Sequence, residues 1–411
     1  MKGKLGSLIL GIAGVLFAWL ALWLRLGHPG DAGMWPWIYL SLSLCVLFEM
    51  IAFRKWIVIL LPLEVVFALC VVLTLTESFF ALREKREARA GELPGRRNWM
   101  VFQEGGKLVD GEVVPYLNPQ EDVTQDARLG LRMRPGIHRI HRCTRWIDGK
   151  EVVSFEAEYM LDEDGFRRVP CRTEAAEFPP VLLFGCSFTF GEGVSQGEEF
   201  ASVLSERFCG KRNVYNFGQS GWSLTEILCL LQDGLPLKEK VEGGVAFVLL
   251  IDDQRQRTRN NGIGKVFRKG TDGTLELVSA WNWLYRRVRN GWLWKSRVVE
   301  RLPAWVWGTP PPEDTWLTTY LEIQHLLQEK YHCSCTAVLY PDCSEEMETA
   351  LRKASVEVLC LKEAMPDYKG YHTRVVDPVY EIPRDGHPNS KTHRIIAEFL
   401  AGHLLDACVP K

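Results

Sequence analysis

A serine and an Asp-His pair stand far apart in this sequence, each where a predicted element begins or ends. Ser187 follows the apolar run 181–184, and Asp385 and His387 lie two residues apart just ahead of the last predicted helix. A serine hydroxyl is a poor nucleophile until a neighbouring base takes its proton, and an imidazole oriented by a carboxylate is such a base. The residue types therefore indicate nucleophilic attack on an acyl bond such as an ester.

A strand-helix alternation surrounds these residues. Continuous apolar runs, typical of strands buried on both faces, occur at 180–185, 213–217, 245–251, 336–340 and 356–361. Helices are expected at 198–209, 223–232 and 390–407, the second opened by a capping box. This alternation predicts an α/β domain, a three-layer sandwich in which helices cover both faces of a parallel sheet. Ser187 then stands past the carboxyl end of the first strand, where such sheets bind ligands.

Three short motifs resemble blocks of the SGNH/GDSL-like hydrolase superfamily, within about residues 130–405. They are Gly185-Cys186-Ser187, Asn216-Phe217-Gly218-Gln219-Ser220-Gly221 and Asp385-Gly386-His387-Pro388-Asn389. The resemblance implies a flavodoxin-like sheet, with Ser187 as nucleophile, His387 as base and Asp385 as the acid that orients it. It also implies an oxyanion hole that includes Ser187 and the N–H of Gly218.

The sequence departs from the superfamily pattern at three points. Cys186 stands where an acidic residue is usual, and the spacing Asp-x-His replaces the more frequent Asp-x-x-His. The third block normally supplies an asparagine to the oxyanion, but the matching segment 250–255 contains none. Gln254 could donate through its side-chain amide instead. Loss of one such donor costs about 2.7–4 kcal/mol of transition-state stabilisation in a known protease.

Each candidate residue also has a structural interpretation. Ser187 could cap a helix, and Asp385 with His387 could stabilise a helix end. We favour catalysis because the three motifs agree in order and spacing. Cys186 is a second candidate nucleophile, but we expect it to point away from the site, because successive side chains of a strand face opposite ways. His138 and His141 are expected at the surface.

The amino-terminal part of the chain predicts membrane spans. Residues 5–24, 35–53 and 56–76 are each about as long and apolar as a transmembrane helix requires. Glu49 and Glu64 lie within these stretches, and we interpret them as protonated or paired carboxylates, with a functional role as the alternative. Basic residues flank both sides, so the positive-inside rule does not decide the orientation, and its count slightly favours a cytoplasmic carboxyl-terminal domain.

The chain therefore divides into a membrane region (1–80), a charged linker (81–98), a small β-rich region (99–178) and the α/β domain (179–411). An insertion at 281–308, rich in Trp and Arg, interrupts that domain. The insertion could lie on a membrane interface, stack against sugar rings, or pack its aromatic side chains on the domain.

Composition excludes some other functions. The formal net charge of -2 argues against a general nucleic-acid binder. Cys333-Ser334-Cys335 is too tight for a usual zinc site, so we expect no metal and no organic cofactor, and the 12 cysteines do not settle the compartment.

The sequence therefore predicts a membrane-anchored serine esterase or O-acyltransferase, acting on acyl (acetyl) esters. Membrane-tethered relatives often act on cell-envelope polysaccharides, which implies a multi-pass protein of the cell (inner) membrane with an extracytoplasmic catalytic domain and an acylated glycan as substrate. The alternative is a catalytically degenerate module of the same fold that binds glycan or assembles with envelope polysaccharide machinery.

Overall fold

The structure is a computed structural model that describes residues 106–118, 121–126, 128–147, 150–236, 241–259, 265–269, 275–279, 312–370 and 376–406. They all belong to one compact unit, which comprises residues 91–280 and 309–411. The expected spans with Glu49 and Glu64, the linker 81–98 and the insertion 281–308 lie outside the described residues. Among the residues described, no helix has the length and apolar character needed to cross a bilayer.

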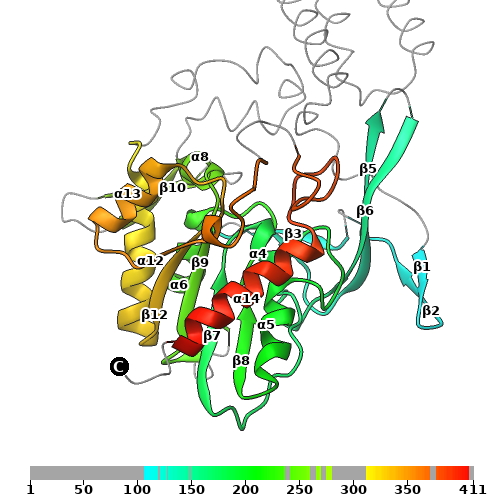
Figure 1. The fold of residues 1–411 in the computed structure, drawn as a ribbon, viewed down its shortest axis with the longest axis horizontal. Helices are drawn as coiled ribbons and strands as arrows, with labels where there is room; N and C mark the ends of the chain where they lie inside the picture. The colour runs from blue at the N-terminus through cyan, green and yellow to red at the C-terminus, as the bar shows by residue number, and fades with distance from the viewer. Residues whose placement is uncertain are drawn as a thin grey trace, which may run out of the picture. The chain divides into compact units, whose positions relative to one another are not determined.

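A five-stranded parallel sheet forms the centre of the unit (Figure 1). Its strands are β7 (Phe178–Phe184), β8 (Arg212–Asn216), β9 (Val245–Leu250), β12 (Ser334–Leu339) and β13 (Val358–Cys360). The spatial order is β13-β12-β9-β7-β8, with every neighbouring pair parallel. This is the order 2-1-3-4-5 of a flavodoxin-like sheet, and the chain changes direction across the sheet at β7 and β9.

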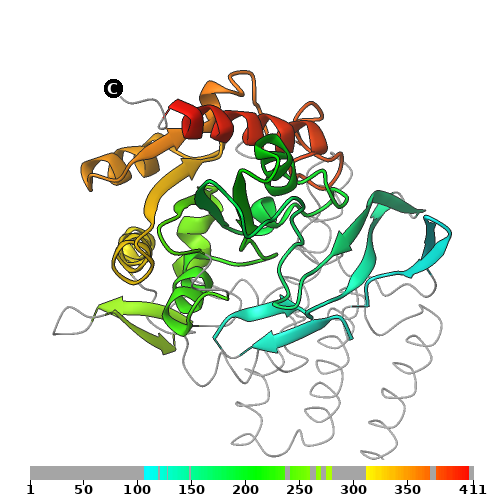
Figure 2. The same ribbon diagram turned by 90° about the horizontal axis from the view of Figure 1, so that it is seen from below.

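Helices cover both faces of this sheet, as Figure 2 shows from below. α5 (Phe200–Phe208) and α14 (Ser390–Asp406) pack together on one face, and α6 (Leu224–Asp233) packs with α12 (Thr315–Tyr331) on the other. Residues of β7 alternate between the two cores: Leu182 and Phe184 join one, Val181 and Leu183 the other. Burial on both faces explains why this strand is a continuous apolar run.

The predicted α/β architecture with a parallel sheet is confirmed. Each predicted strand is present, with ends that differ by one or two residues, and so are the three predicted helices. The capping box also forms: Ser223 Oγ accepts from the backbone of α6, and the Glu226 carboxylate accepts from Ser223 N at 2.7 Å. The prediction omitted α8 (Asp253–Arg259), α12, α13 (Glu345–Lys353) and the 3-10 turn η3 (Leu361–Glu363).

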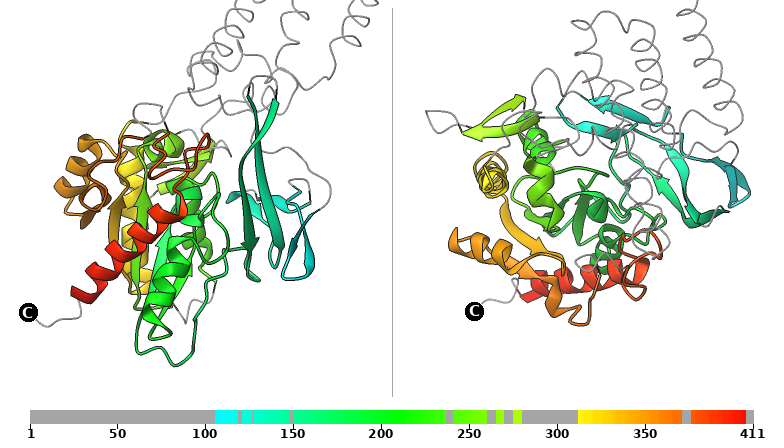
Figure 3. Two further views of the ribbon diagram at one scale, coloured as in Figure 1. Left: turned by 45° about the vertical axis from the view of Figure 1, so that its right-hand side comes forward. Right: turned by 90° about the horizontal axis from the view of Figure 1, so that it is seen from above.

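Four antiparallel hairpins lie outside the parallel sheet in the described chain (Figure 3). They pair β1 (Gly106–Val109) with β2 (Glu112–Pro115), β3 (Val123–Asp126) with β4 (Gly130–Met133), β5 (His138–Ile147) with β6 (Lys150–Met160), and β10 (Lys265–Lys269) with β11 (Leu275–Ser279). A third core joins β5 and β6 to the α/β layers, because Phe155 and Tyr159 pack there with Phe190 and Ile382.

Candidate active site

Ser187 begins a single helical turn directly after the central strand β7. This turn, α4 (Ser187–Phe190), starts after Cys186 and ends at Gly191, which adopts a left-handed conformation with φ of 84°. Gly185 allows the tight entry: a Cβ at that position would lie 2.1 Å from Thr189 Oγ1. The hydroxyl-bearing residue therefore stands at the carboxyl end of the strand, as the sequence predicts, and it is 4% exposed.

The closing loop, residues 382–389, carries the acid and the base. Ile382 N donates to His387 O at 2.8 Å, and a β-bridge joins Glu381 to Pro388. Asn389 ends the loop, because its Oδ1 accepts from Thr392 N at 3.0 Å in the first turn of α14. The backbone around His387 is thus fixed by hydrogen bonds on both sides.

A chain of hydrogen bonds joins the three predicted catalytic side chains. His387 Nε2 lies 3.0 Å from Ser187 Oγ, and His387 Nδ1 bonds to Asp385 Oδ1. Asp385 is 3% exposed and His387 is 21% exposed. If Nδ1 carries the proton that Asp385 accepts, Nε2 presents a lone pair to the serine hydroxyl. This arrangement can remove the hydroxyl proton as the serine attacks a carbonyl carbon.

The charges around His387 favour its protonated form. Burial lowers the pKa of this imidazole, but the neighbouring Asp385 and Glu192 carboxylates outweigh burial, so the pKa is raised above 6.5. An imidazolium formed during proton transfer is therefore stabilised by negative charge already in place.

Glu192 is a site residue that the sequence reasoning missed. Its Oε2 lies 3.8 Å from His387 Nε2, and it accepts a hydrogen bond from Ser220 Oγ at 2.6 Å. Ser220 belongs to the second motif, Asn216 to Gly221, so all three motif segments meet at this point. The only signal in the sequence is the position of Glu192, five residues after Ser187.

The predicted oxyanion donors have different surroundings. No acceptor within the described chain takes the Ser187 N–H at the start of α4. Gly218 N donates to Asn216 Oδ1 at 2.9 Å, and Gln254 Nε2 donates to Trp222 O at 3.3 Å. Two of the three predicted donors therefore have partners inside the protein, and the oxyanion hole remains a prediction.

The β5–β6 hairpin lines another side of the site. His141 is buried at 5% exposure, with its Nδ1 3.2 Å from Tyr159 Oη and its ring edge-on to Phe155. The expectation that His141 lies at the surface is therefore wrong, because β6 and the loop after α4 cover this side of β5. Cys143 of the same strand contacts Asp385, its Sγ 4.0 Å from Oδ2.

The structure also places the remaining candidates. Cys186 is buried in the core shared by α5 and α14, away from Ser187, as its position on the strand predicts. Cys333 and Cys335 are buried too, and burial raises the pKa of both thiols. His138 is partly exposed and binds Glu158 through Nε2 at 2.5 Å. Within the described ranges, no group of three or more His, Cys, Asp or Glu side chains could hold a metal ion.

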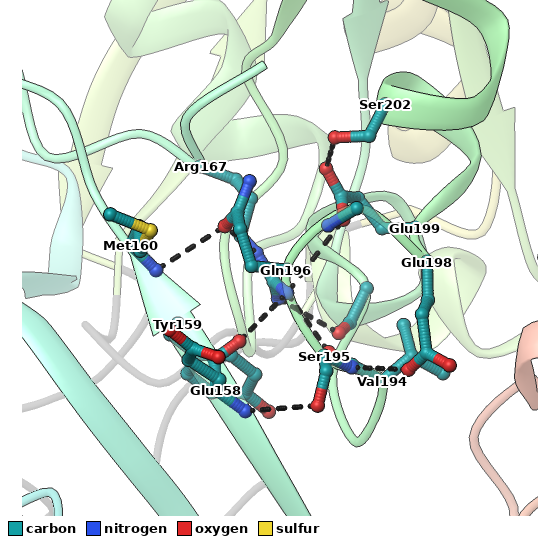
Figure 4. A network of polar contacts seen from close by, with 12 residues as sticks. Glu158, Tyr159, Met160, Arg167, Val194, Ser195, Gln196, Glu198, Glu199 and Ser202 are labelled. Atoms are coloured by element: carbon teal, nitrogen blue, oxygen red, sulfur yellow. Dashed lines mark hydrogen bonds and ion pairs between the residues drawn. The ribbon is translucent and has the colours of Figure 1, made fainter. Parts of the chain in front are cut away.

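Arg167 fixes the loop that carries Glu192. Its guanidinium is fully buried and donates to Gly191 O at 3.1 Å and to Val194 O at 2.9 Å, while it pairs with the buried Glu199 at 3.7 Å (Figure 4). It also reaches β6 through Glu158 O at 3.1 Å. A surface hollow of about 520 Å³ adjoins this network, and none of the predicted site residues lines it.

No known protein family matches the sequence, and a search of curated proteins finds no relative. Solved structures do match over part of the chain. A member of the lipolytic protein G-D-S-L family from Veillonella parvula is 11% identical, over 56% of this chain and 100% of its own, with a TM-score of 0.30. A carbohydrate acetylesterase from Sinorhizobium meliloti is 10% identical, over 56% and 100%, with a TM-score of 0.31. A catalytic mutant of an acetylxylan esterase from Geobacillus stearothermophilus is 9% identical, over 56% and 96%, with a TM-score of 0.32.

Proposed function

We propose that this chain is a serine esterase or O-acyltransferase that acts on acyl esters, with acetyl esters of a cell-envelope glycan as the substrate class. One observation carries the proposal: Ser187 Oγ, the His387 ring and the Asp385 carboxylate form a continuous hydrogen-bonded chain. The three residues come from two segments 200 positions apart in the sequence. A helix cap or a loop pair alone would not require them to meet.

The reaction proceeds in two halves. Ser187 Oγ attacks the ester carbonyl carbon while His387 Nε2 takes the hydroxyl proton, and the carbonyl oxygen becomes an oxyanion. The oxyanion collapses, the bond to the alcohol oxygen breaks, and His387 returns the proton to that oxygen. An acyl-serine remains. Water or a glycan hydroxyl then attacks the acyl carbon while His387 Nε2 takes its proton. The bond between the acyl carbon and Ser187 Oγ breaks, and His387 returns the proton to Oγ, which releases the free acid or the acylated glycan.

The proposal includes a membrane anchor. The three apolar stretches at 5–24, 35–53 and 56–76 support it, together with the length that a bilayer requires. With the amino terminus in the cytoplasm, three spans put the α/β domain on the extracytoplasmic side, where envelope glycans are found.

A fluorophosphonate probe tests both the chemistry and the side of the membrane. Because this reagent phosphonylates only an activated serine, we expect it to label the full chain at Ser187. We expect Ser187→Ala to abolish labelling, and Ser334→Ala, at an exposed serine that begins β12, to retain it. Mass spectrometry of the labelled peptide identifies the modified residue. A probe that cannot cross the inner membrane should label Ser187 in cells whose outer envelope has been made permeable and whose inner membrane is intact.

A non-catalytic module is the second candidate, favoured by the internal hydrogen bonds of Gly218 N and Gln254 Nε2. Absence of any Ser187 adduct in the wild type would support the module and reject the esterase. Labelling that appears only after the inner membrane is broken would contradict the extracytoplasmic placement and leave the enzymatic proposal standing.

A further inference from the structure

Glu192 is held in position by the turn that carries the nucleophile. Its N–H donates to Ser187 O at 3.0 Å, immediately after Gly191 ends α4. Arg167 binds the carbonyl oxygens of Gly191 and Val194 on either side of it. The backbone around Glu192 is therefore fixed relative to Ser187, and little conformational freedom remains to be lost during the reaction.

The Glu192 carboxylate is buried beside a hydroxyl and an imidazole nitrogen. Its side chain is 6% exposed, and its Oε2 lies 2.6 Å from the Ser220 hydroxyl and 3.8 Å from His387 Nε2. A buried carboxylate is unfavourable unless hydrogen bonds or an opposite charge compensate it. At 3.8 Å the two groups are too far apart for a hydrogen bond, and an unprotonated Nε2 carries neither a proton to donate nor a positive charge. The compensation improves when Nε2 gains the proton of Ser187.

Other charged or titratable groups act on His387 from the neighbouring elements. Asp385 lies on the same loop and Glu381 just before it, Arg257 lies on α8, His141 on β5 and His393 on α14. Arg257 opposes a positive charge on His387. Burial lowers the pKa of His141 and of His393, which disfavours a positive charge on either ring. Glu192 differs from Asp385 in facing Nε2, the nitrogen that exchanges the proton with Ser187.

We propose that Glu192 is a positioning residue of this site, whose carboxylate, oriented by Ser220, holds the His387 ring and stabilises its protonated form on the Nε2 side. The inference rests on the proposed function, because it concerns the proton that passes between Ser187 and His387. An interaction that strengthens as the proton transfers lowers the barrier rather than tightening substrate binding.

The pH dependence of ester hydrolysis tests this role in the full chain. With a neutral aryl acetate as substrate, we expect kcat/KM of the wild type to fall on the acidic side of its pH profile. The midpoint of this acidic limb should lie above pH 6.5, because the His387 pKa is raised. In Glu192→Gln, the acidic limb moves to lower pH by about one unit, because an opposite charge next to His387 is lost. The plateau value of kcat falls about tenfold, and KM stays nearly unchanged. Ser220→Ala should move the limb in the same direction by less.

Glu198→Gln is the matched control, because Glu198 lies on the same loop, is exposed, and accepts a hydrogen bond from Ser195 N that glutamine can also accept. This variant should keep the wild-type limb and plateau. If Glu192→Gln lowered the plateau while the limb stayed at the wild-type pH, Glu192 would have only a structural role and the proposal would be rejected.

A second readout separates this inference from the esterase proposal. NMR titration of ¹⁵N-histidine-labelled full chain follows the His387 ring directly and needs no activity. We expect its midpoint to fall in Glu192→Gln and to stay unchanged in Glu198→Gln. If Ser187 never reacts with the fluorophosphonate but the midpoint falls, the esterase proposal fails while the Glu192 interaction stands. An unchanged midpoint rejects the inference whatever the activity.

Discussion

The imidazole of His387 meets a carboxylate through each of its ring nitrogens. Asp385 binds Nδ1, and Glu192 lies 3.8 Å from Nε2. Two carboxylate side chains therefore lie next to the imidazole that faces Ser187. A field of this sign stabilises a positive imidazole, and it repels substrates that carry negative charge close to the scissile bond.

Neutral esters should therefore be hydrolysed faster than anionic esters of similar size. At 8 Å and an effective dielectric between those of protein and water, one carboxylate repels another by about 1 kcal/mol. We expect kcat/KM for an aryl acetate to exceed that for the aryl half-ester of succinate at least fivefold at low salt, after correction for their reactivity in buffer. Glu192→Gln should narrow this ratio, and Glu198→Gln should not. A ratio that is the same in wild type and Glu192→Gln would contradict the expectation.

Short motifs were sufficient to predict which residues meet at the site, but not all of them. Ser187, Asp385 and His387 each lie in a segment with recognisable neighbours, and the structure brings them within hydrogen-bond reach. Glu192 and His141 have no such local pattern. Glu192 gains its partners only when the second motif supplies Ser220, and His141 is buried only when β6 and Tyr159 pack on it. These are long-range contacts that sequence spacing does not encode.

At the scale of elements, one buried arginine joins the strand β6 to the loop after α4. Arg167 donates to three backbone carbonyls and to Gln196, lies over the Tyr159 ring with its Cζ 4.5 Å from the centroid, and pairs with Glu199. Burial raises the pKa of Glu199, and the nearby Arg167 opposes that shift. The hairpin and the α/β layers therefore depend on one another at this point.

Removal of Arg167 should be strongly destabilising. Arg167→Ala leaves the Glu199 carboxylate buried without its cation and several carbonyls without donors, at a cost of about 3–5 kcal/mol in the free energy of unfolding. Denaturation of the full chain in detergent, followed by tryptophan fluorescence, measures the loss. Arg168→Ala, at the adjacent exposed residue, should change stability by less than about 0.5 kcal/mol. Equal effects for the two variants would refute the role assigned to Arg167.

The predicted strands were recognisable because burial on both faces demands uninterrupted apolar residues. The omitted helices differ among themselves. Helix α12 has a clear helical spacing of buried side chains at Trp316, Tyr320, Ile323, Leu327 and Tyr331, so its pattern was present in the sequence. Helix α13 buries only Met347 and Leu351, too few for a period to be recognised. Its position depends on packing against β13 rather than on its own pattern.

At the scale of the whole molecule, buried titratable groups on the two sides of the sheet change the stability of the fold in opposite directions as the pH changes. Burial raises the pKa of Glu226, at the start of α6, from 4.5 to about 7. Burial lowers the pKa of His393, on α14, from 6.5 to about 3, and its Nδ1 accepts from Phe200 N at 3.2 Å. The His393 contribution to stability is complete above pH 6.5 and is lost as the pH falls towards 3.

Glu226 should have the opposite effect on the pH dependence of stability, and a substitution of Glu226 measures its contribution alone. Because its folded pKa exceeds its unfolded pKa, its contribution to stability is fully present below pH 4.5 and is lost as the pH rises through about 7. Glutamine does not titrate but can still accept from Ser223 N. The free energy of unfolding of Glu226→Gln, relative to that of the wild type, should therefore rise by about 3 kcal/mol between pH 4.5 and pH 8.

Chemical denaturation of the full chain at a series of pH values measures this difference. Glu206→Gln, at an exposed carboxylate on α5, is the control and should follow the wild type. A difference between Glu226→Gln and wild type that does not change with pH would show that Glu226 does not titrate in this range.

The separation of 200 positions between Ser187 and His387 also has a consequence for biosynthesis. At translation rates of about 5–20 residues per second, the serine leaves the peptidyl transferase centre roughly 10–40 s before the histidine is joined to the chain. During that interval Ser187 lacks the His387 imidazole that accepts its proton in the proposed reaction. If the proposed function holds, the Ser187–His387 pair cannot form until the loop that carries His387 has been synthesised.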